Sequence, residues 1–376
     1  MLSQRICGRP TRGRTPLLGA AVIATVSALL IAALASASTA NRASGPAAAR
    51  ALVTTAMKAK TTWIGPTSSP PLVTGKTIGI IPCATFIEGC AREANGVIAA
   101  AKAAGWTTIE LNGNANPQTE QQAMDSLIAR KVDAIVLNSI NASSVGEGMS
   151  HAKTAHIPVI VSFAQDPTPF GGIADVRIND TLAGEVIGAY MVTNGGGNVV
   201  AVYDNSAQEV IQRFQGLQQA FKMFGGGKLI VNDPISGAQI GPSESNLMGA
   251  LLQKYPKGQI NWIFCGYDFS CVPLVQEIKR AGRTEIKATG YDGNLQNLGF
   301  IRSGEVQVAA VGYPLEWAGW AVVDDLNRYF NHSPLWPGAK YFDFRLLTKA
   351  DVPHPGTSYQ GDINYKAKFK QLWKVK

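Results

Sequence analysis

The stretch "VDAIVLNSINASSVGEGMSHAKTAHIPVIVSFAQD", residues 132–166, decides the fold class. It contains two short apolar runs rich in β-branched residues, 132–138 and 157–164, separated by a segment long enough for a helix. Runs that are apolar throughout are typical of strands buried on both faces, as in a parallel sheet. Residues 132–166 are therefore interpreted as one strand–helix–strand unit of an α/β fold.

The same alternation continues from Lys76 toward the C-terminus. Within "EQQAMDSLIAR", residues 120–130, apolar residues fall on one face at helical spacing. Strands alternating with helices predict parallel sheets with helices on both faces, and 376 residues are enough for two domains. The further strand candidates are 76–81, 107–112, 197–204, 228–233, 261–266, 286–292 and 306–312. The helical stretches include 86–104, 118–130, 182–193, 207–224 and 244–255.

Residues 1–40 have the pattern of a secretory signal peptide. Four arginines and no acidic residue precede the apolar stretch 17–40, whose last residues are small, as at a cleavage site. An uncleaved membrane anchor is the alternative, because the stretch is about long enough to span a bilayer. Its many Ala, Ser and Thr residues favour cleavage, and no cysteine follows at which a lipid could be attached. Either way we expect an exported protein, in the periplasm or at the outer face of the cell membrane.

The charge of the exported part is modest. Removing residues 1–40 lowers the net charge from +8 to +4, which is too mild to indicate a nucleic-acid partner. Residues 41–75 are predicted to form a lead-in with one short helix within 49–63. The segment "GPTSSPP", 65–71, ends that helix because its prolines favour an extended chain.

Four cysteines follow the export segment, in two local pairs. Cys83 and Cys90 flank the point where a strand leads into a helix, and Cys265 and Cys271 do the same later in the chain. An even number of cysteines in an oxidising compartment favours disulfides, with three pairings open. A zinc site would need closer cysteine spacing or nearby histidines. Four free, buried thiols are the remaining alternative.

Polar and aromatic residues follow the predicted strands. In parallel α/β sheets ligands bind beyond the carboxyl ends of the strands. Rings stack on the apolar faces of sugars, while carboxylates and amides form hydrogen bonds with hydroxyl groups. Any one of these residues could instead be a helix cap or a half-buried ring, but their shared location favours a binding site. They are Phe86, Phe163, Gln165, Asp166, Asp204, Asn205, Tyr267, Asp268, Phe269, Asp292, Tyr313 and Glu316.

Several segments resemble the type I periplasmic binding proteins. They are residues 132–166, "NDTLAGEVIGAYM" (179–191), "RFQGLQQAF" (213–221) and "TGYDGN" (289–294). The resemblance runs from about Lys76 to the C-terminus and is strongest to the ribose- and galactose-binding branch, the solute receptors of ABC transporters.

The resemblance implies two Rossmann-like lobes with parallel sheets, joined by a three-stranded hinge that closes on a ligand. The first lobe would comprise residues 76–178 and 314–339, and the second 179–313 and 340–376. A protein that must open at its hinge cannot link its two lobes by a disulfide across the cleft. The resemblance therefore predicts the local pairs Cys83–Cys90 and Cys265–Cys271.

The set of sugar-binding residues that is usual in that branch is incomplete in this sequence. Phe163 and Ala164 stand where sugar receptors often have Asp-Arg, and Ile211 stands near the place of another arginine, with Arg213 two residues on. Tyr267 replaces a common asparagine. A pocket that loses arginine and gains rings favours a flatter or less polar ligand.

The aromatic pair that usually follows the first strand is also replaced, around Gly89 and Cys90, although Asp292 matches the family well. Combining position and resemblance, the predicted ligand-binding residues are Phe86, Phe163, Gln165, Asp166, Arg213, Gln239, Tyr267, Asp268, Asp292, Tyr313 and Glu316.

Other functional classes lack the residues they need. None of the four histidines falls in a predicted cleft loop, no G-x-S-x-G is present, and both triple-glycine runs precede strands rather than open helices. An export segment stands where a related DNA-binding regulator would have a helix-turn-helix. We therefore expect a monomeric solute receptor that is not an enzyme and has no cofactor or metal. Its partners would be a small molecule, a sugar or a less polar ligand, and an ABC permease. The alternative is a receptor that serves a membrane signalling protein.

Overall fold

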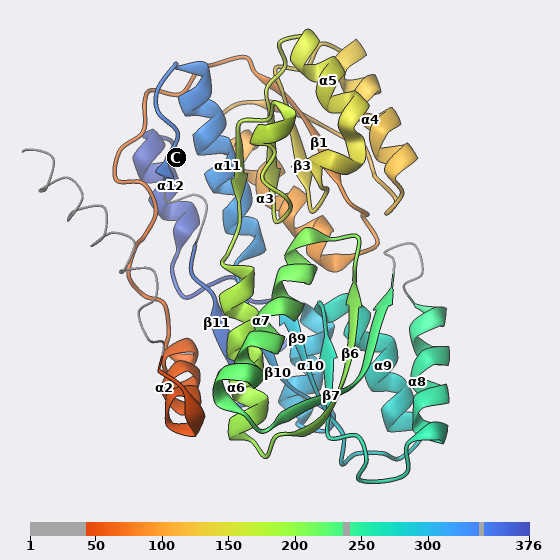
Figure 1. Ribbon diagram of the computed structural model, residues 1–376. Helices are drawn as coiled ribbons and strands as arrows, with labels where there is room; N and C mark the ends of the chain where they lie inside the picture. The colour runs from red at the N-terminus through yellow and green to blue at the C-terminus, as the bar shows by residue number, and fades with distance from the viewer. Residues whose placement is uncertain (1–42, 236–240, 338–341) are drawn as a thin grey trace, which may run out of the picture. The chain divides into compact units, whose positions relative to one another are not determined.

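The computed structural model describes residues 43–235, 241–337 and 342–376 (Figure 1). The predicted signal peptide, 1–40, lies outside these residues. No helix in the described part of the chain is long and apolar enough to cross a membrane.

The first lobe is built on a five-stranded parallel sheet with strand order β2-β1-β3-β4-β5. Ile80 pairs with Val136, and Val136 with Ile160, so the centre of the sheet is apolar on both faces. Helices α3 and α11 cover one face, and α4 and α5 cover the other (Figure 1). The strands are β1 Thr77–Pro82, β2 Thr107–Glu110, β3 Ala134–Asn138, β4 Val159–Ser162 and β5 Ala174–Val176. The helices are α3 Glu88–Ala103, α4 Pro117–Ala129, α5 Gly146–Thr154 and α11 Leu315–Phe330.

The second lobe is built on a six-stranded sheet with strand order β11-β10-β9-β8-β6-β7. All neighbours are parallel except β11, which pairs antiparallel with β10 at the edge. Helices α6 and α7 cover one face, and α8, α9 and α10 the other. The strands are β6 Gly197–Asp204, β7 Gly227–Ile235, β8 Trp262–Cys265, β9 Lys287–Asp292, β10 Gln307–Gly312 and β11 Arg345–Thr348. The helices are α6 Asp180–Thr193, α7 Gln208–Phe224, α8 Pro242–Lys254, α9 Asp268–Arg280 and α10 Leu295–Ser303.

The predicted α/β class with two parallel-sheet lobes is confirmed. Each predicted strand has its counterpart within a few residues, but β5 and β11 were not predicted from the sequence. β5 has only three residues, one of them Asp175, and β11 is an antiparallel edge strand outside the strand–helix alternation.

A pair of glycines brings two helices together in each lobe. A Cβ on Gly96 or Gly319 would overlap the backbone of the facing helix where α3 crosses α11. Gly184 and Gly216 have the same relation where α6 crosses α7. Only glycine allows this approach, so these crossings fix how α3 and α7 stand over their sheets.

Both ends of the described chain pass between the lobes. α2 (Gly45–Met57), the helix of the lead-in, packs on α6, α7 and β11 of the second lobe. The chain then reaches the first lobe, where Trp63 stacks on Trp317 with ring centroids 5.3 Å apart.

The C-terminal helix α12 (Tyr365–Trp373) also packs on the first lobe, with Trp373 stacked on Trp320 at 5.3 Å. The indole N–H of Trp373 donates to the Asp324 carboxylate at 2.8 Å. Assigning all of 340–376 to the second lobe therefore does not describe α12, whose rings have their partners on α11.

Candidate ligand-binding site

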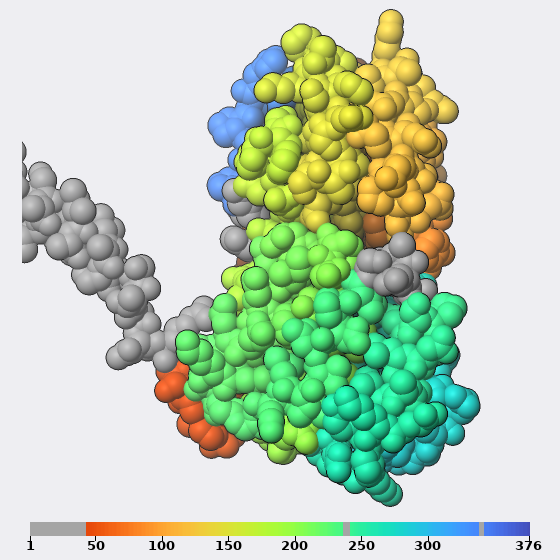
Figure 2. All heavy atoms as spheres, turned by 45° about the vertical axis from the view of Figure 1, so that its right-hand side comes forward, coloured from red at the N-terminus to blue at the C-terminus, as the bar shows by residue number. Residues whose placement is uncertain are grey.

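A cavity of about 340 Å³ lies between the two lobes, at the carboxyl ends of strands from both sheets. The first lobe contributes residues that follow β1, β3 and β4, and the second lobe contributes residues that follow β6, β8, β9 and β10. The lobes meet beside it, where the side-chain amide of Asn141 donates to the carbonyl oxygen of Ser206 at 2.8 Å. Figure 2 shows the yellow residues of the first lobe against the green residues of the second. The cavity is lined mainly by Ile87, Glu93, Glu120, Ser139, Asn141, Phe163, Asp204, Ser206, Glu209, Val210, Arg213, Tyr267, Asp292 and Tyr313, together with Cys83 and Cys90.

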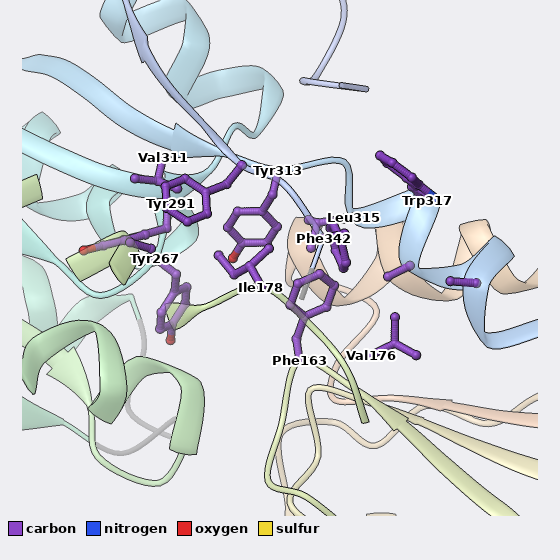
Figure 3. Close-up of a cluster of buried hydrophobic side chains, with 14 of the residues drawn as sticks. Phe163, Val176, Ile178, Tyr267, Tyr291, Val311, Tyr313, Leu315, Trp317 and Phe342 are labelled. Atoms are coloured by element: carbon purple, nitrogen blue, oxygen red, sulfur yellow. The ribbon is translucent and has the colours of Figure 1, made fainter. Parts of the chain in front are cut away.

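Of the predicted ligand-binding residues, Phe163, Arg213, Tyr267, Asp292 and Tyr313 line this cavity. The ring of Phe163 lies 5.1 Å from that of Tyr313, measured between centroids, and these two come from different lobes (Figure 3).

The other predicted residues do not line the cavity. Asp268 is fully buried under β9, where it accepts hydrogen bonds from the Asn294 backbone N–H at 2.8 Å and from the Gln307 amide at 3.0 Å. A Cβ on Gly290 would overlap the Asp268 carboxylate, so glycine at this position allows the carboxylate to pack against β9. Glu316 of α11 forms an ion pair with the buried Arg92 of α3 at 3.0 Å.

Three further predictions also fall away from the cavity. Phe86 is 56% exposed and lies 6.2 Å from the ring of Phe269, across the junction of the lobes. Asp166 accepts a hydrogen bond from the Thr168 backbone N–H at 3.0 Å, as a turn residue does. Gln165 is held by its backbone N–H, which donates to Asn141 at 3.1 Å. The predicted Gln239 lies outside the described residues.

Three residues of the cavity wall have left-handed backbones. φ is +52° at Ser139, +49° at Phe163 and +90° at Asp292, each at or just after the end of a strand. A residue other than glycine costs about 1–3 kcal/mol in such a conformation and is retained mostly where function requires it. These turns direct the three side chains into the cavity.

A buried network joins Arg213 to the acids of the second lobe. Its Nε donates to Asp180 at 2.9 Å and one terminal nitrogen donates to the Tyr313 hydroxyl at 2.5 Å. Tyr313 in turn donates its proton to the Asp292 carboxylate. Burial raises the pKa of Asp180, although the neighbouring guanidinium opposes that rise. Arg213 is thus held in place by protein groups before any ligand is present.

Acidic side chains that the sequence reasoning missed complete the wall. Glu93 of α3 accepts hydrogen bonds from Ser139 at 2.8 Å and Ser162 at 3.0 Å, and burial raises its pKa well above the usual value. Burial also raises the pKa of Glu209 to about 8 and that of Glu120 to about 7. These residues lie on helices rather than directly after strands. One of them could have been found from the sequence. Glu93 is a charged residue on the same helical face as the apolar Cys90 and Val97, which indicates a buried acid.

The predicted disulfide pairs are confirmed. Cys83 and Cys90 are bonded with their Cα atoms 5.8 Å apart, and Cys265 and Cys271 with theirs 5.2 Å apart. Each bond lies within one lobe, at the start of the helix after a strand. The first pair is part of the cavity wall. Among the described residues, no group of three or more His, Cys, Asp and Glu side chains is arranged to hold a metal ion.

Comparisons with known proteins agree with this architecture. The xylitol-binding protein of Mycolicibacterium smegmatis is 26% identical over 226 residues, which are 58% of this chain and 62% of that protein. The ribose import binding protein of Escherichia coli is 21% identical over 216 residues, 56% of this chain and 70% of the relative. The crystal structure of an ABC transporter solute binding protein from Mycobacterium smegmatis with bound glycerol superposes with a TM-score of 0.68 at 18% identity. It covers 76% of this chain and 99% of that chain.

The match to a family profile shows which family the chain belongs to. The profile described as the periplasmic binding protein domain matches residues 78–332, which include the first sheet except Thr77 and all of the second except β11. The relatives are sugar and polyol binding proteins of the ribose-binding type, as the sequence motifs predicted. This chain belongs to the periplasmic binding protein family.

Proposed function

We propose that this protein is the solute-binding component of an ABC importer, and that it holds a polyhydroxylated small molecule, a sugar or a polyol, without changing it. The observation that supports this most directly is the cavity between the lobes, in which rings and hydrogen-bonding groups from both sheets converge. Relatives named for binding xylitol and ribose are similar to this chain in sequence.

The wall of the cavity suits such a ligand. Phe163 and Tyr267 offer ring faces to the C–H surfaces of a carbohydrate. Asn141, Ser139 and Asp292 offer amide, hydroxyl and carboxylate groups to its hydroxyls. Because these groups come from both lobes, a ligand makes its full set of contacts only when the lobes are together. That difference in affinity is what drives closure and presents a closed form to the permease.

A thermal-shift screen followed by calorimetry tests this function. The panel consists of ribose, xylitol, glucose, sorbitol, myo-inositol and their amino derivatives. A true ligand at 100 times its dissociation constant should stabilise the protein by about 2.7 kcal/mol. Mass spectrometry after long incubation should recover the ligand unaltered. Steady formation of a product, or no binding by any member of the panel, would contradict the proposal.

A genetic test distinguishes import from sensing. Deletion of the gene for this protein should abolish uptake of the identified ligand, to the same extent as deletion of the cognate permease. Intact uptake together with a lost transcriptional response to the ligand would instead identify a sensory receptor.

A further inference from the structure

The cavity has an excess of carboxylates. Its wall includes five acidic side chains, which are Glu93, Glu120, Asp204, Glu209 and Asp292, and among the described residues a single guanidinium, that of Arg213. That guanidinium is already bound to Asp180, which is 1% exposed. It also lies 3.8 Å from the Asp292 carboxylate, so the described part of the cavity wall has one cation for five acids.

These acids face one another from the two lobes. Glu93 and Glu120 belong to α3 and α4 of the first lobe, whereas Asp204, Glu209 and Asp292 belong to the second. Burial is the main cause of the raised pKa of Glu93, and the charges of Glu209 and Asp292 raise it further. The electrostatic effect of one lobe thus reaches the other through the cavity.

A buried hydroxyl in the cavity wall provides an independent sign of a polar ligand. Tyr267 lines the cavity and is 8% exposed, and its hydroxyl has no hydrogen-bond partner among the described residues. Buried polar groups are nearly always paired, so this hydroxyl is directed at something that binds there. Its ring and those of Phe163 and Tyr313 also offer π faces, which attract cations.

We infer that the ligand is a polyhydroxylated amine, a sugar or polyol with a protonated amino group, and that its ammonium lies between the carboxylates of the two lobes. This inference rests on the proposed function. It also gives a physical reason for closure. An ammonium placed between carboxyl groups of the two lobes favours their ionised forms and attracts both, so it draws the lobes together.

Matched pairs of ligands test the charge directly. Each pair consists of a neutral compound and the same compound with one hydroxyl replaced by an amine: xylitol, sorbitol, myo-inositol and glucose with their amino-deoxy counterparts. The amine should bind at least tenfold more tightly than its neutral partner in at least one pair. Neutral compounds that bind as tightly as their amines in every pair would overturn the inference and leave the proposed function intact. No binding by either member of any pair would contradict both.

Isosteric variants locate the ammonium. Glu209→Gln and Glu120→Gln keep the shape of the wall and remove its charge, and should weaken binding of the amine by tenfold or more while changing that of the neutral partner little. Glu147→Gln, on the exposed surface of α5, is the matched control and should leave both affinities unchanged. Equal losses for amine and neutral ligand would show that the acids act as hydrogen-bond acceptors only, which would overturn the role given to their charge.

The affinity for the amine should also depend on pH. Glu209, with a pKa of about 8, faces Arg213, Asp180 and Asp204, and for Glu120, with a pKa of about 7, burial is the only cause of the shift. An alkyl amine, with a pKa of about 10.4 like that of lysine, stays protonated from pH 6 to pH 8.5. Ammonium binding favours ionised carboxylates, so affinity should rise over this range, by up to about tenfold per pH unit for each proton released. A flat or falling profile would contradict the inference, as would an equal rise for the neutral partner.

Discussion

Tyr267 is a cavity residue whose hydroxyl group can be compared with that of a nearby buried tyrosine. It is the N-cap residue of α9, and its ring is packed in the buried apolar core. Tyr291 lies deeper, fully buried beneath the guanidinium of Arg213, which is 4.9 Å from its ring centroid. Among the described residues neither hydroxyl has a hydrogen-bond partner, yet only Tyr267 lines the cavity. The two tyrosines therefore form a natural comparison between a binding hydroxyl and a buried one.

We predict that Tyr267→Phe weakens ligand binding by about 0.5–1.5 kcal/mol, the net contribution of one hydrogen bond. Tyr291→Phe should leave affinity unchanged, since its hydroxyl lies outside the cavity wall. Both variants should keep or slightly raise the melting temperature, because each removes a buried polar group without a partner. Calorimetric titration and thermal unfolding provide the two measurements. An equal loss of affinity in both variants would remove Tyr267 from the binding groups.

The sequence was informative about positions but not about side-chain directions. Phe163, Tyr267, Asp292 and Tyr313 follow strand ends and do line the cavity, because parallel strands place their carboxyl ends at one edge. Asp268 follows a strand just as closely, but its carboxylate turns under β9 to meet Asn294 and Gln307. The direction of the Asp268 side chain depends on partners that lie far along the chain, so no local sequence pattern predicts it.

At the scale of elements, the glycine pairs determine where the helical residues of the site stand. Gly184 on α6 and Gly216 on α7 let the two backbones touch, and α7 then presents Glu209 and Arg213, one turn apart, to the cavity. Gly96 and Gly319 do the same for α3, which presents Glu93. The periodicity of apolar residues predicted these helices. Their positions over the sheets depend on pairs of glycines that tertiary packing brings together, and periodicity does not show these pairs.

We predict that Gly184→Ala destabilises the protein by about 1–3 kcal/mol, because the added methyl group would overlap the carbonyl oxygen of Arg213 and force α6 and α7 apart. Gly299→Ala in α10 is the control, since a Cβ there meets no atom within 4 Å. It should be neutral or stabilise by about 0.5–1 kcal/mol, the helix preference of alanine over glycine. Chemical denaturation measures both. A Gly184→Ala protein as stable as the parent would show that α6 and α7 can accommodate a methyl group where they cross.

At the scale of the whole described fold, segments near both ends of the chain cross between the lobes together. Residues 58–62 and 360–364 run side by side, joined where the Lys60 backbone N–H donates to Asp362 at 2.8 Å. Arg345 of β11 binds Asp362 at 3.1 Å, Asp351 at 2.7 Å and the carbonyl oxygen of Met57 at 2.8 Å. One guanidinium therefore fastens the lead-in and the C-terminal segment to the second lobe. Neither crossing belongs to the predicted three-stranded hinge.

We predict that Arg345→Met releases these two segments. It leaves two half-buried carboxylates without their cation and should cost about 1–3 kcal/mol. Hydrogen exchange followed by mass spectrometry should become faster in residues 45–60 and 355–364, while β1, β3 and β4 keep their protection. Arg280→Gln provides the control, because that guanidinium pairs with Glu277 on an exposed helix surface. Unchanged exchange in both regions would show that α2 and the segment 355–364 are held without Arg345.

The paired crossings have a consequence for the energetics of ligand capture. Each segment that ties the lobes together limits how far they can separate, at 58–62, 177–179, 313–314 and 360–364. Under such a tether, the second lobe meets a ligand already held by the first at a high effective concentration, as in a bivalent binder. Little entropy then remains to be lost on closure, so a modest set of contacts in the second lobe is enough for tight overall binding. A protein of this kind can let its ligand go quickly once one lobe is displaced, as the proposed delivery to a transporter would require.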